Sequence, residues 1–180
     1  WRRASHTLTH VTLTARAGKC VLTLKPASSG ITAAASNAWG LDDSDSWTTD
    51  TTPPTADIVD ITPDPRNSAV GTVSITFSES VTGVDVADFT LTRNGSPVSL
   101  SGLTVGGSGA SYTLNLSTVT ALAGNYVLTL NAASSGITDA ASNALGLDAS
   151  DSWVTDTTPP TADIVDITPD PRNSAVGTVS

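Results

Sequence analysis

Hydrophobic and polar residues alternate with a period of two along much of the chain. Val73, Ile75 and Phe77 alternate with serine and threonine, and similar alternation runs through residues 112–117 and 126–131. This period places every second side chain on one face of an extended strand, so each run predicts a half-buried β-strand. The expected strands are residues 55–62, 71–78, 89–92, 98–100, 112–117, 126–131 and 151–156.

Turn residues separate these expected strands. Pro63 and Pro65, with Asp64 between them, predict a turn after the first strand. Asn94-Gly95 predicts a tight hairpin. The expected loops are residues 79–88, with short extended pieces, residues 102–109 (flexible) and residues 134–150. About seven short strands separated by turns are typical of an immunoglobulin-like (Ig-like) sandwich of two antiparallel sheets, so the predicted fold class is all-β.

The chain also repeats itself. Residues 51–74 recur letter for letter as residues 157–180, which lie 106 positions later, and residues 17–74 differ from residues 123–180 at only eight positions. A long period of this kind indicates tandem copies of one unit. The expected parts are residues 1–52, a truncated and degenerate C-terminal half of one repeat; residues 53–158, a complete repeat; and residues 159–180, the truncated first strands of the next. The Pro-Pro pair that opens each unit predicts a stiff, extended joint.

Tyr126 lies two residues before Leu128 at the start of the sixth expected strand. Ig-like sandwiches place a tyrosine at this position, where its hydroxyl bonds to the backbone a few residues upstream. We therefore predict a tyrosine corner. In the first copy Cys20 takes the place of Tyr126, and His10 takes the place of Leu116. These replacements predict that residues 1–52 pack poorly.

Composition narrows the class of protein. The net charge is −9, all but one of the 17 acidic residues are aspartate, and five of the eight basic residues precede residue 26. Aspartate prefers turns to helix interiors, which favours a sheet protein. The complete unit carries no basic patch, so nucleic acid is not an expected partner. The single cysteine excludes an internal disulfide, and no apolar run is long enough to predict a membrane span.

Three stretches carry a resemblance to a known family. They are ITFSESVTGVDVADFTLT (residues 75–92), SGITDAASNAL (residues 135–145) and DTTPPTADIVDITPDP (residues 50–65 and 156–171). These stretches resemble the bacterial Ig-like repeats of very large secreted or cell-surface proteins. The resemblance implies a tandem Ig-like stalk in an extracellular or surface location, often concerned with adhesion. It also implies domains that fold without disulfides.

Catalysis is not expected. The complete unit contains no histidine, because His6 and His10 both precede it, and no base accompanies Cys20. No serine lies in a Gly-x-Ser-x-Gly elbow, and the glycines do not follow the spacing of a phosphate loop. The sequence therefore predicts a protein that is not an enzyme.

Carboxylates give a candidate metal site. In an Ig-like sandwich the loop after the second strand and the loop before the last strand lie at the end where the chain enters. Carboxylate oxygens in flexible loops suit Ca²⁺, which takes six to eight oxygen ligands, although aspartate is also a common solvated turn residue. The six candidate ligands are Asp50, Asp57, Glu79, Asp85, Asp88 and Asp139.

The leading functional hypothesis is a structural or adhesive repeat that acts as a stalk or spacer, with Ca²⁺ stiffening its joints. Its expected partners are the neighbouring repeats of the same chain. The alternatives are a module that binds surface glycans or proteins, and an accessory domain of an extracellular hydrolase.

Trp47 and Trp153 occupy equivalent positions in the two copies. An exposed tryptophan could stack on a sugar, but we expect a large aromatic residue on a strand to belong to the core.

Overall fold

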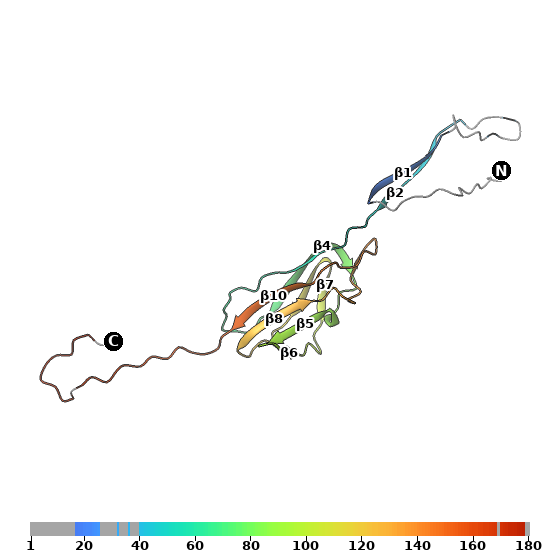
Figure 1. The fold of residues 1–180 in the computed structure, drawn as a ribbon. Coiled ribbons are helices and arrows are strands. Elements are labelled where there is room, and N and C mark those ends of the chain that lie inside the picture. The colour runs from blue at the N-terminus through green and yellow to red at the C-terminus, as the bar shows by residue number, and fades with distance from the viewer. Residues whose placement is uncertain (1–16, 26–31, 33–35, 37–39, 169, 179–180) are drawn as a thin grey trace.

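The computed structural model of the chain describes residues 17–25, 32, 36, 40–168 and 170–178 (Figure 1). These residues form strands joined by turns, with one 3₁₀ turn, η1 (Val86–Asp88). The strands are β1 (Gly18–Leu24), β2 (Asp43–Thr49), β3 (Ala56–Ile58), β4 (Thr72–Thr82), β5 (Phe89–Arg93), β6 (Ser96–Val98), β7 (Val105–Asn115), β8 (Gly124–Leu130), β9 (Thr138–Asp139) and β10 (Ala149–Thr155). Among the residues described, no helix is long and apolar enough to cross a membrane.

Strands β3 to β10 form a sandwich of two sheets. One sheet has the order β10-β8-β5-β6, and the other has the order β3-β4-β7 with β9 paired to β4. All of the strand ladders are antiparallel. Alternate residues of both sheets point inward, and Ile75, Leu114, Leu128 and Leu130 are completely buried between them. The predicted all-β, Ig-like antiparallel sandwich is confirmed.

Most strand ends differ from the prediction by one to four residues, and the main differences concern β4, β7 and the extra strand β9. Strand β4 continues without a break to Thr82, through residues 79–82, where we expected a loop with only short extended pieces. Strand β7 begins at Val105, inside the region expected to be flexible, and β9 lies inside the expected loop 134–150. The cause is pairing between distant segments, because Val81 is opposite both Gly109 and Asp139 after a shift of register in β4.

Local sequence signals predicted the β5–β6 hairpin, the tyrosine corner and one of the two expected core tryptophans. Asn94 and Gly95 both have positive φ and form the tight hairpin between β5 and β6. The Tyr126 hydroxyl donates a hydrogen bond to the Leu122 carbonyl at 2.9 Å, which is the predicted tyrosine corner. Trp153 is 2% exposed and belongs to the core, as predicted. Trp47 was also expected in the core, but it is 37% exposed, because the described part of the first copy holds only the β1–β2 hairpin and no facing sheet.

Strands β1 and β2 form a separate hairpin beyond one end of the sandwich (Figure 1). Their bounds lie 106 positions before those of β8 and β10, and Cys20 is opposite Trp47 just as Tyr126 is opposite Trp153. Among the described residues, β1 has only β2 as a partner. Leu22 and Leu24 are therefore 41% and 43% exposed. The predicted position of His10 lies outside the described residues.

The open edge of β10 is covered by the chain that follows β3. Asp151 accepts a hydrogen bond from the Ile61 backbone N–H at 2.8 Å, and Asp64 accepts one from the Val154 N–H at 2.8 Å. At the opposite edge of the same sheet, the three-residue strand β6 carries Pro97, which has no N–H to offer another strand. Both edges of this sheet are thus protected.

Candidate metal centre

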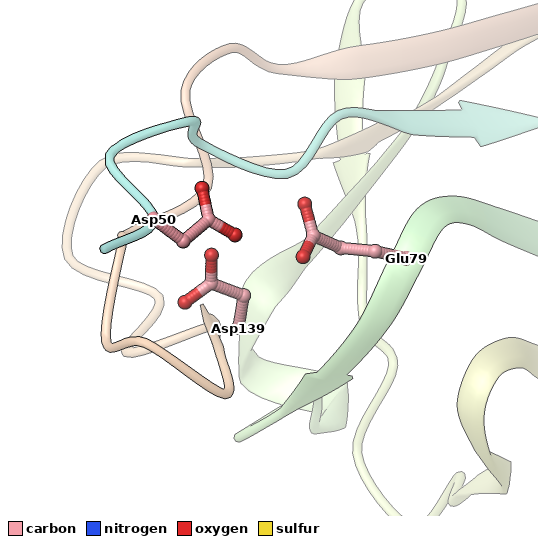
Figure 2. A group of neighbouring side chains, drawn as sticks. All are labelled: Asp50, Glu79 and Asp139. Carbon is pink, nitrogen blue, oxygen red and sulfur yellow. The ribbon is translucent and has the colours of Figure 1, made fainter. Parts of the chain in front are cut away.

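Three acidic side chains meet at the end of the sandwich where the chain enters. Asp50, Glu79 and Asp139 each place a carboxylate oxygen within 4.8 Å of the others. Figure 2 shows them converging from three segments that are distant in sequence: the joint before β3, strand β4 and strand β9. Asp50 is exposed, Glu79 is half-buried and Asp139 is buried.

The approach of β9 to β4 sets the distance between Glu79 and Asp139. Val81 of β4 is directly opposite Asp139 in this short ladder. Just beyond it, Gly83 has φ +89° and passes so close to Gly136 that an added Cβ would lie 2.6 Å from the Gly136 carbonyl oxygen. Glycine at position 83 is therefore required for this approach, both by its φ and by the available space.

Asp139 is fixed by hydrogen bonds within its own turn. Its Oδ1 accepts the backbone N–H groups of Ala141 and Asn143, both at 2.8 Å, and its Oδ2 accepts the Asn143 Nδ2 at 2.8 Å. Burial alone would raise the pKa of Asp139, but these hydrogen bonds favour the charged form and hold its pKa below the ordinary value. Asp139 is therefore a pre-oriented carboxylate.

Glu79 has the opposite electrostatic environment. Partial desolvation raises the pKa of Glu79 above its ordinary value, and the negative charges of Asp139 and Asp50 raise it further. The group is thus a set of mutually repelling charges. A cation placed among them would remove that repulsion.

Asp50 is connected to the following sandwich through its backbone. The Nδ2 group of Asn143 donates to the Asp50 carbonyl at 3.2 Å, in addition to its bond with Asp139. Sequence reasoning missed Asn143. No pattern in the sequence singles it out, because nearly all positions of the two aligned copies are identical.

The other three predicted ligands do not join this group, which corrects the expected grouping. Asp57 lies on β3, exposed and opposite Thr76. Asp85 and Asp88 instead form a capping box on η1, in which Asp85 accepts the Ala87 N–H at 2.7 Å and Asp88 accepts the Asp85 N–H at 2.8 Å. These two carboxylates satisfy backbone donors that would otherwise be unpaired.

The three converging carboxylates offer hard oxygen ligands of the kind that Ca²⁺ prefers. They supply only part of a full shell of six to eight oxygens, so the backbone and water would have to supply the rest. The set contains no histidine or cysteine, which does not suit a softer transition metal.

Comparison with known proteins gives two kinds of match. A family model described as "Bacterial Ig-like domain" matches residues 50–158, more than half of the chain. No curated protein matches. Among solved structures, the chain is similar to the N-terminal part of the bacterial S-layer protein SbsC, at 16% identity and a TM-score of 0.41, covering 63% of this chain and 26% of that one.

A second solved structure, the S-layer protein rSbsC(31-844), is similar at 17% identity and a TM-score of 0.38, covering 63% of this chain and 15% of that one. The chain thus spans about a quarter or less of these S-layer structures. The family match extends over the whole sandwich and begins at Asp50, a member of the acidic group. This chain belongs to the bacterial Ig-like domain family.

Proposed function

We propose that this chain is a non-catalytic segment of a large bacterial extracellular or cell-surface protein, in which tandem Ig-like units form a stalk or spacer. The observation that carries the proposal is the internal repeat. Residues 51–74 and 157–180 are identical, and the β1–β2 hairpin has the bounds and register of β8 and β10 displaced by 106 positions.

The path of the chain supports a linear arrangement of units. The joint from β2 enters the sandwich at one end, and the segment that follows β10 leaves from the opposite end (Figure 1). Units joined in this way would add length instead of folding back on one another. The expected partners of each unit are therefore its neighbours along the same chain.

A length measurement tests the spacer role. Appending a copy of residues 75–158 after Ser180 completes a second unit, and small-angle X-ray scattering should show the maximum dimension growing by about one sandwich length. A control chain extended by a flexible glycine-serine segment of equal length should show a broader distribution of distances. Two units packed side by side, with little gain in maximum dimension, would refute the stalk.

The second part of the proposal is that Ca²⁺ binds between Asp50, Glu79 and Asp139 and stiffens the joint. Asp50 directly follows the hairpin strand β2, whereas Glu79 and Asp139 belong to the sandwich ahead of it. A bound ion would tie the two together and cancel the repulsion among three carboxylates. The mechanical role of the joint would then depend on extracellular calcium.

Calcium binding can be measured directly by calorimetry and by the melting temperature in calcium and in chelator. Calcium should raise the melting temperature, and Asp50→Asn or Glu79→Gln should reduce both the shift and the affinity. Asp60→Asn is a matched control, because Asp60 is exposed and lies outside the group. An unchanged melting temperature with no heat of binding would exclude the ion.

A further inference from the structure

We infer that the aspartate at each joint is held from both sides: the unit behind it binds its backbone N–H, and the unit ahead binds its carbonyl. Asp156 shows the first contact and Asp50, its identical counterpart, shows the second. Successive units then have no unrestrained residue between them. This inference rests on the proposed tandem arrangement and adds a joint that is stiff without an ion.

The contact with the unit behind is formed at the end of β10. The Asp156 N–H donates to the Arg66 carbonyl at 2.8 Å, and the Arg66 N–H donates to the Val154 carbonyl at 2.9 Å. The loop that presents Arg66 is fixed by its own side chain, which donates to the carbonyls of Ser68 and Ala69 at 2.8 and 3.1 Å. The chain leaving the sandwich is therefore held as far as Asp156.

The contact with the unit ahead begins at the equivalent residue. Asn143 Nδ2 donates to the Asp50 carbonyl at 3.2 Å, and the Gly146 N–H donates to the Pro54 carbonyl at 3.3 Å. Pro54 is buried against the sandwich. The joint from Asp50 onward is thus part of the unit that it enters.

The two joints have the same sequence and the same local turn. The Thr52 N–H donates to Asp50 Oδ1 at 2.9 Å, and the Thr158 N–H donates to Asp156 Oδ1 at 2.9 Å. Residues 157–168 are exposed and carry no contact of the kind that Asn143 makes. The partner that fits this segment is the loop of a following unit equivalent to residues 139–146.

Backbone NMR relaxation compares the two joints within one molecule. In chelator, Thr51 and Thr52 should show the ¹⁵N heteronuclear NOE of the sandwich, whereas Thr157 and Thr158 should show lower values. Appending residues 75–158 after Ser180 should raise Thr157 and Thr158 to the sandwich value. Asn143→Ala should lower the values at Thr51 and Thr52, and Asn115→Ala, an exposed asparagine in β7, should not.

Hydrogen exchange tests the contact between the joint aspartate and the unit behind it. The Asp156 N–H should exchange slowly, and Arg66→Ala should accelerate it by disordering the loop that presents the Arg66 carbonyl. If Thr157 and Thr158 stay mobile in an extended chain whose second unit is folded, the inference that both units hold the joint is refuted, although the tandem arrangement stands. If they become rigid only with calcium, the ion holds the joint and the inference is equally refuted. An added unit that packs beside the first refutes the stalk itself.

Discussion

The rings of Tyr126 and Trp153 stack in the core of the sandwich, with centroids 5.3 Å apart and planes 6° from parallel. The two residues are cross-strand partners in the β8–β10 ladder. The Tyr126 hydroxyl also closes the tyrosine corner on Leu122. One side chain therefore contributes apolar packing through its ring and a turn-closing hydrogen bond through its oxygen.

Substitutions at Tyr126 should separate these contributions. Tyr126→Phe keeps the ring and loses the hydrogen bond, so it should lower the free energy of unfolding by about 1 kcal/mol. Tyr126→Cys reproduces the residue at position 20 and also removes the ring, which should cost about 3 kcal/mol or more. Urea denaturation followed by circular dichroism measures both values. Equal losses for the two variants would show that the stack contributes nothing.

Thr120 satisfies a buried backbone donor. It is completely buried, accepts the Val70 N–H at 2.9 Å and donates to the Leu116 carbonyl at 2.9 Å. Thr120→Val leaves the Val70 N–H unpaired and should cost about 1–3 kcal/mol of stability. Thr120→Ser keeps the oxygen and loses one methyl, so it should cost about 0.8 kcal/mol. A valine variant as stable as the serine variant would contradict the assigned role of the hydroxyl.

Gly83 should be intolerant of a side chain. Gly83→Ala places a Cβ 2.6 Å from the Gly136 carbonyl oxygen, whereas Gly102→Ala, at a similar positive φ, meets nothing within 4 Å. Both should pay the cost of a positive φ, about 1 kcal/mol, and only Gly83→Ala should also move β9 from β4. The melting temperatures of the two variants measure the difference. Gly83→Ala should also weaken the proposed calcium binding, by displacing Asp139 from Glu79.

The pH dependence of stability should distinguish Glu79 from Asp139. The folded state raises the pKa of Glu79 above its ordinary value of 4.5. The contribution of Glu79 to the free energy of unfolding is therefore fully present below pH 4.5, and it is lost as the pH rises through the raised pKa. The folded state lowers the pKa of Asp139 below its ordinary value of 3.8. The contribution of Asp139 to the free energy of unfolding is therefore present above pH 3.8, and it is lost as the pH falls through the lowered pKa. In chelator at neutral pH, Glu79→Gln should raise the melting temperature and Asp139→Asn should lower it. Changes of the same sign would contradict this electrostatic account.

Much of the fold could be predicted because its signals are local. Period-two alternation marks β4, β5 and β8, and Asn94-Gly95 defines a hairpin from two residues. The start of β7 could not be predicted in this way. Its glycines have little intrinsic preference for strands, and Gly107 (φ +100°) is shaped by its approach to the Ser111 backbone. That contact exists only after the chain has folded.

The candidate site was predicted in part for the same reason. General loop positions in Ig-like sandwiches brought Asp50, Glu79 and Asp139 to one end, although Glu79 lies on a strand and not in a loop. Asp85 and Asp88 lie outside this group because their spacing suits a capping box, in which local backbone donors bond to one oxygen of each.

The chain segment that covers the edge of β10 has a consequence for the folding of neighbouring domains. When near-identical domains are synthesised one after another, each domain folds close to many strands of the same sequence. An exposed strand edge can then pair with a strand of the wrong domain. Here the N–H and the carbonyl of Val154, on the edge of β10, are already engaged by Asp64 and Arg66. A half-folded neighbour therefore finds part of this edge already occupied. In the proposed tandem arrangement, this loop would oppose the mispairing that sequence identity between adjacent domains promotes.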